Sequence, residues 1–206
     1  MTPLDQVKLK LVGLFAGSSK SDHVEPLTVI QEKKKIILLH RKKGGEIVCF
    51  TSEDGLTFAP SRIKRAAPEY SQEFPHLISI PGTKNAYFGD RNIYFATSKD
   101  GKKWESHKKP LIMSAHPLEV GGVFVRKDGV LLLYFEKQIK QGVTYYSAHT
   151  AFFDKKNPEI VLWKTTTPLW KHTDIWTGKV ISPVGSILLN DKIVMYWHVD
   201  KEALYS

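Results

Sequence analysis

The chain has 206 residues and a mass of 23.4 kDa, the size of one ordinary domain or two small ones. Apolar residues make up 42% and charged residues 25%, which excludes a disordered, collagen-like or coiled-coil chain. The sequence has no run of the roughly 18 apolar residues that a transmembrane helix needs. The single cysteine, Cys49, excludes a disulfide framework and a multi-cysteine zinc site. We therefore expect a cytoplasmic protein that does not interact with membranes.

Lys and Arg outnumber Asp and Glu by 30 to 21, and most of this charge lies in short clusters where turns are expected. A nucleic-acid binder is expected to gather such charge on one groove or helix, with exposed aromatic side chains. We interpret the clusters mainly as solvated hairpin tips and expect no nucleic-acid partner. Binding of another polyanion, or attraction of a small anion such as phosphate, stays open. The clusters are Lys33–Lys35, Arg41–Lys43, Arg62–Arg65, Lys102–Lys103 and Lys108–Lys109.

The expected elements are short β-strands rich in Val, Ile, Leu, Phe and Tyr and bounded by turn residues. Tight hairpins are predicted at Asp128-Gly129 and Asn190-Asp191, whose residues tolerate positive φ. No segment has a sustained helical period, so we predict an all-β, predominantly antiparallel fold. In chain order the strands are Lys8–Phe15, Leu27–Gln31, Ile36–Arg41, Ile47–Ser52, His76–Ile80, Asn92–Ser98, Gly122–Arg126, Val130–Phe135, Tyr145–Phe153, Ile160–Trp163, Val184–Leu189 and Ile193–His198.

The motif S-x-D-G-x-x-aromatic occurs twice, at Ser52–Phe58 and Ser98–Trp104, so that its two aspartates are 46 positions apart. A period of about 40–50 residues with several strands per unit is typical of a β-propeller. The motif resembles the Asp-box of sialidases and related propellers. We expect Asp54 and Asp100 to be structural, with their carboxylates bonded to turn amides and the two aromatic side chains buried between blades.

These observations predict a single β-propeller domain over residues 1–206. The repeat units are about 7–60, 61–110, 111–170 and 171–206, and the last is incomplete, so the propeller has about three and a half blades. An open propeller exposes strand edges that invite pairing with other chains. We therefore expect Val7–Phe15 either to complete the last blade or to pair across a subunit interface in a homo-oligomer.

Several segments together resemble the β-mannoside phosphorylases of glycoside hydrolase family 130, which are five-bladed propellers. The resemblance covers about residues 25–205. It implies action on mannose-containing oligosaccharides or sugar phosphates, with inorganic phosphate as co-substrate and no other cofactor. The segments are Asp128–Tyr134 (family D-G-W-L-L-I-Y), Tyr145–Asp154 (Y-x-L-G-A-A-L-L-D), Asn157-Pro158 (N-P), Pro168-Leu169 (P-I-L), Tyr196–Asp200 (end of the last blade, Y-Y-G-A-A-D) and Leu38–Arg41 (L-L-Y-R).

The departures from the family pattern concern its chemistry. The family has an E-D-P-R strand whose Asp is the general acid and whose Arg faces the ligand. Here the segment reads Glu73-Phe74-Pro75-His76, so Phe replaces the acid and His replaces the Arg. The family's Y-H-G becomes Tyr134-Phe135-Glu136, so another polar contact becomes apolar. Because Phe cannot transfer a proton, the family's mechanism cannot apply unchanged.

Polar residues at the ends of the inner strands are the candidates for ligand contact, because propellers bind ligands at the mouth of the central channel. Arg41 could hold a phosphate or a sugar carboxylate, or be solvated. Glu73 is the candidate acid and His76 a candidate ligand contact, or both are ordinary surface or hydrogen-bonded groups. Asp200 matches the family's final Asp, or is a turn residue. His149, in an apolar strand, is expected to be a hydrogen-bonded core histidine.

Two classes of function follow from these residues. The first is a carbohydrate-active propeller that acts on or binds mannose-containing oligosaccharides and is catalytically impaired. If it is active, it is a glycoside phosphorylase or hydrolase. The second is a non-catalytic sugar-binding or scaffold propeller. Hydrolysis usually needs two carboxylates about 5–9.5 Å apart, and Glu73, Glu136 and Asp200 are the carboxylates expected near a channel. No histidine spacing indicates a metal site.

Overall fold

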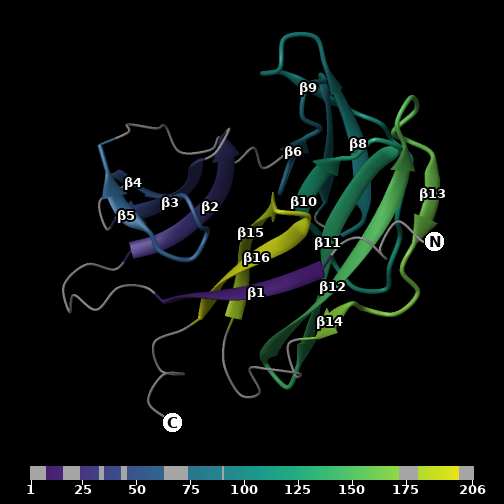
Figure 1. Ribbon diagram of the computed structural model, residues 1–206. Helices are drawn as coiled ribbons and strands as arrows, with labels where there is room; N and C mark the ends of the chain where they lie inside the picture. The colour runs from purple at the N-terminus through teal and green to yellow at the C-terminus, as the bar shows by residue number, and fades with distance from the viewer. Residues whose placement is uncertain are drawn as a thin grey trace. The chain divides into compact units, whose positions relative to one another are not determined.

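The computed structural model describes residues 8–15, 24–32, 35–42, 46–62, 74–89, 91–171 and 181–199. Within these ranges every regular element is a β-strand, so the all-β prediction is confirmed (Figure 1). None of the described segments is a helix that is long and apolar enough to cross a membrane. The chain divides into two compact units. Unit 1 is Met1–Glu69 with Gly178–Ser206, and unit 2 is Tyr70–Thr177. The single domain stays a prediction.

Unit 1 contains two sheets. The first has the strand order β2-β3-β4-β5 and is antiparallel throughout. The second has the order β1-β16-β15, in which β15 and β16 form an antiparallel hairpin. The strands are β1 (Lys8–Phe15), β2 (Val24–Glu32), β3 (Lys35–Lys42), β4 (Ile47–Ser52), β5 (Ala59–Ser61), β15 (Ile181–Leu189) and β16 (Lys192–Val199).

The N-terminal strand β1 pairs with β16 along its whole length, from Lys8 opposite Lys192 to Phe15 opposite Val199. This pairing is parallel, whereas all other strand pairings in the described residues are antiparallel. The sequence analysis expected this segment either to complete the last blade or to pair with another subunit. In the structure it adds a strand to the last sheet within the chain. The predominantly antiparallel fold is also confirmed.

The two sheets of unit 1 pack through an apolar cluster in which Leu38 of β3 meets Tyr196 of β16. The Tyr196 hydroxyl donates a hydrogen bond to the Gly55 carbonyl at 3.0 Å, and the ring of Phe58 meets the Tyr196 ring edge-on at 5.9 Å. The turn after β4 is therefore fixed by the neighbouring sheet. The other members of the cluster are Val29, Ile36, Phe50, Val184, Ile187, Leu189 and Val194.

Unit 2 also contains two sheets, both antiparallel. Their strand orders are β6-β7-β8-β9 and β10-β11-β12-β13, and β14 pairs with β12 as well. The strands are β6 (Ile78–Ser79), β7 (Asn85–Gly89), β8 (Ile93–Ser98), β9 (Trp104–Ser106), β10 (Leu118–Val125), β11 (Gly129–Lys140), β12 (Val143–Asp154), β13 (Val161–Lys164) and β14 (Trp170–Lys171).

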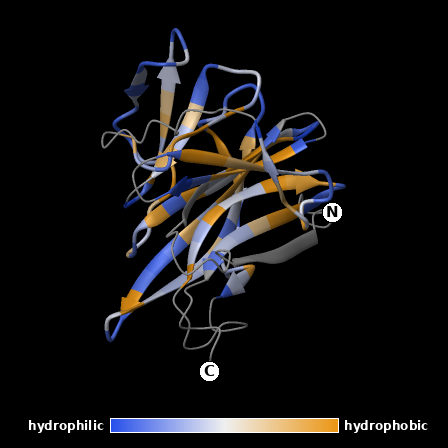
Figure 2. Cartoon of the chain, turned by 90° about the vertical axis from the view of Figure 1, so that its left-hand side faces the viewer, coloured by the Kyte–Doolittle hydropathy of each residue, from blue (hydrophilic) through white to orange (hydrophobic). Residues whose placement is uncertain are grey.

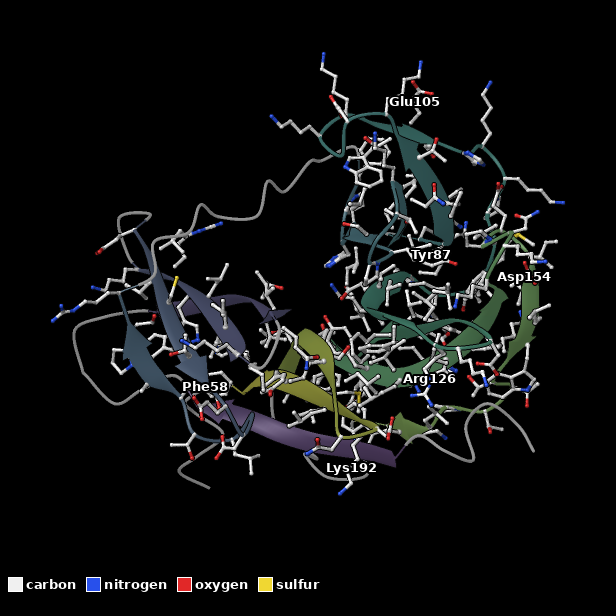
Figure 3. The ribbon with its side chains drawn as sticks, turned by 45° about the horizontal axis from the view of Figure 1, so that its top comes forward. Phe58, Tyr87, Glu105, Arg126, Asp154 and Lys192 are labelled. Atoms are coloured by element: carbon white, nitrogen blue, oxygen red, sulfur yellow. The ribbon has the colours of Figure 1, made fainter. Side chains whose placement is uncertain are left out.

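The core of unit 2 lies between these sheets and centres on Tyr87, which is fully buried. Its ring packs on Phe95 of its own sheet and on Phe153 of the other, at 5.7 and 4.8 Å between ring centroids. Its hydroxyl donates to the Pro158 carbonyl at 2.7 Å, which ties the Asn157-Pro158 loop to the first sheet. Hydrophobic residues follow the strands and hydrophilic residues the turns (Figure 2). Figure 3 shows Tyr87 inside unit 2 and Glu105 on its outside.

The aspartates of the repeated motif have the structural role that the sequence predicts. Asp54 Oδ1 accepts hydrogen bonds from the amides of the second and third residues after it, both at 2.8 Å, and Asp100 does the same. Asp154 repeats the arrangement at 2.8 and 2.6 Å. Backbone hydrogen bonds, first of all from Thr57 and Lys103, hold the pKa of Asp54 and Asp100 below the ordinary value. These carboxylates stabilise turns.

The aromatic side chains of the two motifs behave differently. Phe58 is half-buried against the neighbouring sheet of unit 1, as described above. Trp104 is half-buried too, but it packs on Phe88 and Tyr94 of its own sheet and on Phe74, which precedes that sheet. Its expected position between two blades stays a prediction.

Some strand boundaries also differ from the prediction. The expected strand His76–Ile80 is reduced to Ile78–Ser79, because His76 has a φ of 53° and lies in a turn. The sequence analysis missed β7, whose small residues Ala86 and Gly89 are buried, and the short strands β5, β9 and β14. Short outer strands present few unpaired backbone groups at a sheet edge.

Two glycines provide a test of the packing in unit 1. Gly55 and Gly101 occupy the same turn position, with φ of 74° and 77°. A Cβ on Gly55 would meet the Tyr196 hydroxyl at 2.9 Å, whereas a Cβ on Gly101 would meet nothing within 4 Å. We expect Gly101→Ala to lower the free energy of unfolding by about 1 kcal/mol through backbone strain. Gly55→Ala should lower it by about 1–3 kcal/mol more through overpacking. Equal losses in denaturant unfolding would contradict this packing.

Candidate functional site

In three of the sheets a hairpin, β2–β3, β10–β11 or β15–β16, places candidate residues at one end of the sheet. We call this the polar end: the end at which the first strand of the hairpin begins and its second strand leaves the buried core. In unit 2 it is formed by Leu118 at the start of β10 and Glu136 on β11, which lie opposite each other. In the first sheet of unit 1, β3 reaches it at Arg41, and in the second sheet β16 reaches it at His198.

The pairing of β11 with β12 gathers polar side chains at the polar end of unit 2. Glu136 lies opposite Ser147, and Tyr134 lies opposite His149. Directly opposite residues of antiparallel strands share a face, and so do residues two apart on one strand. All four therefore lie on the face that carries the core residue Leu132. The polar cluster is thus a continuation of the core face toward solvent.

Glu136 is the centre of this cluster. Ser114, from the segment before β10, donates its hydroxyl to Glu136 Oε1 at 3.0 Å. His149 Nε2 lies 3.5 Å from Glu136 Oε2 and 3.2 Å from Ser147 Oγ. Thr165 Oγ1 lies 3.5 Å from the other ring nitrogen, Nδ1. The side chain of Glu136 is 18% exposed and that of His149 is 11% exposed, so both are largely shielded from water.

The arrangement is not a serine–histidine–acid relay. Such a relay needs the hydroxyl at one ring nitrogen and the carboxylate at the other. Here Ser147 and Glu136 both approach Nε2 of His149. The cluster instead offers one carboxylate, two serine hydroxyls and an imidazole as hydrogen-bonding groups.

Burial sets the protonation of the two rings in this cluster. The ring of His149 stacks on Tyr134, with centroids 5.3 Å apart and planes inclined by 16°. Burial lowers the pKa of His149, and the charge of Glu136 opposes this shift. Burial also raises the pKa of Tyr134 to about 12. At neutral pH the imidazole and the phenol are therefore uncharged. His149 is a hydrogen-bonded core histidine, as the sequence predicts.

A second carboxylate, Glu119 on β10, lies on the opposite face of the same sheet. It is buried, and Lys137 Nζ lies 3.7 Å from its Oε1. Burial raises the pKa of the neighbouring Tyr146, and the charge of Glu119 adds to the shift. Glu119 lies opposite Phe135, one residue from Glu136, so the two carboxylates point to opposite faces. They cannot flank one glycosidic bond.

The positions that the resemblance assigns to the family's acid and to a polar contact are both apolar in the structure. Phe74 is buried and meets the ring of Phe88 at 5.1 Å, with the planes at 74°. Phe135 is 1% exposed, and its ring fills the space where Gly121 would otherwise carry a Cβ. Phe74 therefore cannot supply the proton that the family mechanism needs at its position.

In unit 1 the polar end of β3 carries His40 and Arg41 on opposite faces. His40 is buried, and its ring lies 5.1 Å from that of Phe50. Burial first, and then the proximity of His198, lower the pKa of His40 from 6.5 to about 4. Arg41 is half-buried at the end of the face formed by Ile37 and Leu39, and it stays a candidate for anion binding.

The other predicted site residues have different outcomes. Glu73 and Asp200 lie outside the described residues. His76 is exposed in a turn, and the strand on which it was expected begins only at Ile78. Among the residues that the structure describes, no group of three His, Cys, Asp or Glu side chains could hold a metal ion.

The sequence analysis missed the contacts of Glu136 with Ser114 and His149. A signal for one of them was present. The two-residue turn Gln141-Gly142, with φ of 51° and 78°, joins β11 directly to β12. A two-residue hairpin turn fixes the register of its strands, and this register places His149 opposite Tyr134, on the same face as Glu136. The position of Ser114 has no comparable signal, because an irregular segment carries it.

Comparison with solved structures shows the fold. A glycosyl hydrolase from Bacteroides ovatus matches over 85% of this chain and 62% of its own, at 16% identity and a TM-score of 0.53. A protein assigned as a glycosidase from Bacteroides thetaiotaomicron VPI-5482 matches over 85% of this chain and 64% of its own, at 19% identity and a TM-score of 0.50. The chain has the fold of these glycosidases. It is an all-β propeller of the five-bladed glycosidase type with fewer blades, as predicted, and its described residues form three sheets of four or five strands and one of three.

The resemblance to the glycosidase-related propellers is thus confirmed at the level of fold. The chain spans less than two thirds of the length of these two structures. A third structure belongs to the family 130 mannoside phosphorylases, described as containing hydrolases that target β-1,2-mannosidic linkages in Candida mannan. It matches over 85% of this chain at 15% identity, covers 61% of its own length and has a TM-score of 0.49. Family models and curated protein sequences give no match.

The buried His40 predicts a pH dependence of stability. Its pKa of about 4 in the folded chain is below the ordinary 6.5, so the unfolded chain takes up the proton first as the pH falls. We expect the free energy of unfolding to decrease by up to about 3 kcal/mol between pH 6.5 and pH 4 from this group. His40→Gln should flatten this slope in chemical unfolding, whereas His76→Gln, at an exposed turn, should not. An unchanged slope in His40→Gln would refute the assignment.

Proposed function

We propose that the protein binds mannose-containing oligosaccharides at the polar end of unit 2, and that its activity as a phosphorylase or hydrolase is impaired. The observation that carries this proposal is the apolar burial of Phe74 and Phe135, at the positions of the family's acid and of a polar contact. The fold that the chain shares with glycosidases supports carbohydrate as the class of ligand. Because a single cysteine cannot form a disulfide framework, we still place the protein in the cytoplasm.

The groups at the polar end of unit 2 suit hydroxyl-rich ligands. The Glu136 carboxylate can accept hydrogen bonds from sugar hydroxyls, and Ser114 and Ser147 can both donate and accept. A phosphorylase needs a general acid and a cationic cradle for phosphate. On the Glu136 face of unit 2 the described residues supply a carboxylate but no lysine or arginine within ion-pairing distance of it.

An active enzyme would have to use a different acid. Glu73 directly precedes Phe74, and it is the proposed replacement for the family's acid. Arg41, His76 and Asp200 are the proposed contacts to substrate or to inorganic phosphate as co-substrate. A homo-oligomer formed through open sheet edges also stays a proposal, although β1 already covers β16 within the chain.

The purified chain can be tested with a β-mannobiose and inorganic phosphate. We expect binding of the disaccharide in calorimetry and release of mannose-1-phosphate far below the ordinary enzyme range of about 1–10³ per second, because no acid stands at the family's position. Turnover in that range would refute the impairment. In that case Glu73→Gln should abolish turnover, whereas Glu105→Gln, an exposed change on β9, should leave it unchanged. A screen of sugars in which none binds the chain would contradict the proposal as a whole.

A further inference from the structure

The contact between the two sheets of unit 1 ends in two histidines. On β3, His40 lies two residues beyond Leu38. On β16, His198 lies two residues beyond Tyr196. Residues two apart on a strand share a face, and Leu38 and Tyr196 pack together between the sheets. His40 and His198 therefore continue this contact to the polar end, where they face each other from the two sheets.

The opposite end of the contact is held by groups that do not titrate near neutral pH. There the Tyr196 hydroxyl donates its hydrogen bond to the Gly55 carbonyl at 3.0 Å, and the ring of Phe58 packs edge-on against that of Tyr196. Burial first, and then the charge of Asp54, raise the pKa of Tyr196 to about 12, so this hydroxyl keeps its proton. Acid can therefore act on one end of the contact, the polar end.

The surroundings of His40 do not stabilise a second proton on its ring. His40 is buried, and among the described residues its Nε2 has no hydrogen-bond partner. A protonated His40 is therefore a buried cation without an acceptor, which is costly. The residues opposite His40 and His198 in the strand register are all uncharged: Pro26 and Val48 for the first, and Leu14 and Ser182 for the second.

The charged groups around His40 do not offset a proton on its ring either. The carboxylate of Glu46 is already paired, with Lys42 Nζ 3.4 Å from its Oε2. Lys42 is on the same face of β3 as His40, and Arg41 is on the other. Burial first, and then the charge of His198, lower the pKa of His40 to about 4. A charged His198 therefore disfavours the protonation of His40 while the sheets are in contact.

We propose that the polar end of this contact opens in acid: once His40 and His198 both carry a proton, the two sheets of unit 1 separate there, while the end held by Tyr196 stays closed. Separation lets water reach both rings, which removes the cost of burying a charge and screens the repulsion between them. The opening is a property of unit 1 and does not depend on sugar binding at unit 2.

Proton uptake by His40 sets the size of the effect. The pKa of this ring is about 4 in the closed contact and has the ordinary value of 6.5 once water surrounds it, so the open form binds more protons between these two values. A change from pH 7.5 to pH 5.5 should therefore raise the open population about tenfold.

Thiol labelling of full-chain variants measures this opening. Val29 is buried in the contact, where a Cβ on Gly185 of the other sheet would lie 3.0 Å from its Cγ1, so Val29→Cys is the probe. Val194 lies in the same contact but two residues before Tyr196, farther from the polar end, so Val194→Cys is the matched control. The native Cys49, buried on the other face of the first sheet, reports opening of that whole sheet. Each rate is divided by the rate of the same thiol in the denatured chain.

The two probes should differ. At pH 5.5 the Val29→Cys thiol should react faster than Cys49 in the same molecule, and about tenfold faster than at pH 7.5. The Val194→Cys thiol should react no faster than Cys49, because its end of the contact stays closed.

Three histidine variants, each combined with Val29→Cys, identify the groups responsible. His40→Gln should abolish the rise in acid. His198→Gln should reduce the rise, because the pKa of His40 then lies closer to its ordinary value. His116→Gln, an exposed change in unit 2, should leave the labelling rates unchanged. Melting curves establish that each variant is folded, and the half-exposed position of His198 makes its replacement the milder one.

The opposite results overturn the proposal. If Val29→Cys reacts no faster than Cys49, only unfolding of the whole sheet exposes it. If Val194→Cys reacts as fast as Val29→Cys, the contact does not open at the polar end alone. If the rise is unchanged in a folded His40→Gln or His198→Gln variant, other groups cause it. The proposed sugar binding stands in each of these cases.

Discussion

The second strand of each large sheet is buried on both of its faces, and this constraint determines where chemistry can occur. On β3 every residue from Ile36 to His40 is buried, and on β11 every residue from Gly129 to Phe135 is buried. Such a strand needs packing partners on both sides, so its side chains are apolar without alternation. Polar groups can appear only where the strand leaves the core. On β11 that point is Glu136, and on β3 it is His40 and Arg41, which explains why the candidate residues occupy equivalent ends of their sheets.

The same burial explains why apolar side chains suit two positions at which the resembled family carries polar ones. Phe74 and Phe135 lie next to surfaces that are already apolar, and each makes ring contacts or fills space beside a glycine. Such replacements add buried apolar area and remove polar groups that need hydrogen bonds. Glu136, one residue beyond Phe135, keeps a carboxylate at this end of the sheet. Its partners Ser114 and His149 make it a fixed hydrogen-bond acceptor, and neither supplies positive charge.

Much of the fold could be predicted because the strands are apolar and their turns carry Asp, Asn and Gly at fixed positions. The hydrogen bonds of Asp54 and Asp100 follow from that turn chemistry alone. The strand β7 was missed because Ala86 and Gly89 have no β-propensity, and only the close packing of the sheet makes them suitable there. The site was harder to predict than the fold, since Glu136 and His149 meet through strand register and Ser114 meets Glu136 through tertiary structure.

The central claim is that the polar end of unit 2 is a sugar-binding surface. Amide chemical shifts of the isotope-labelled chain, titrated with β-mannobiose, test it most directly. The account predicts that the largest changes fall on the amides of Ser114, Glu136, Ser147 and His149, with little change in the lysine-rich turn Lys99–Lys103 at the other end of its sheet. Changes confined to that turn, or no changes at saturating sugar, would contradict it.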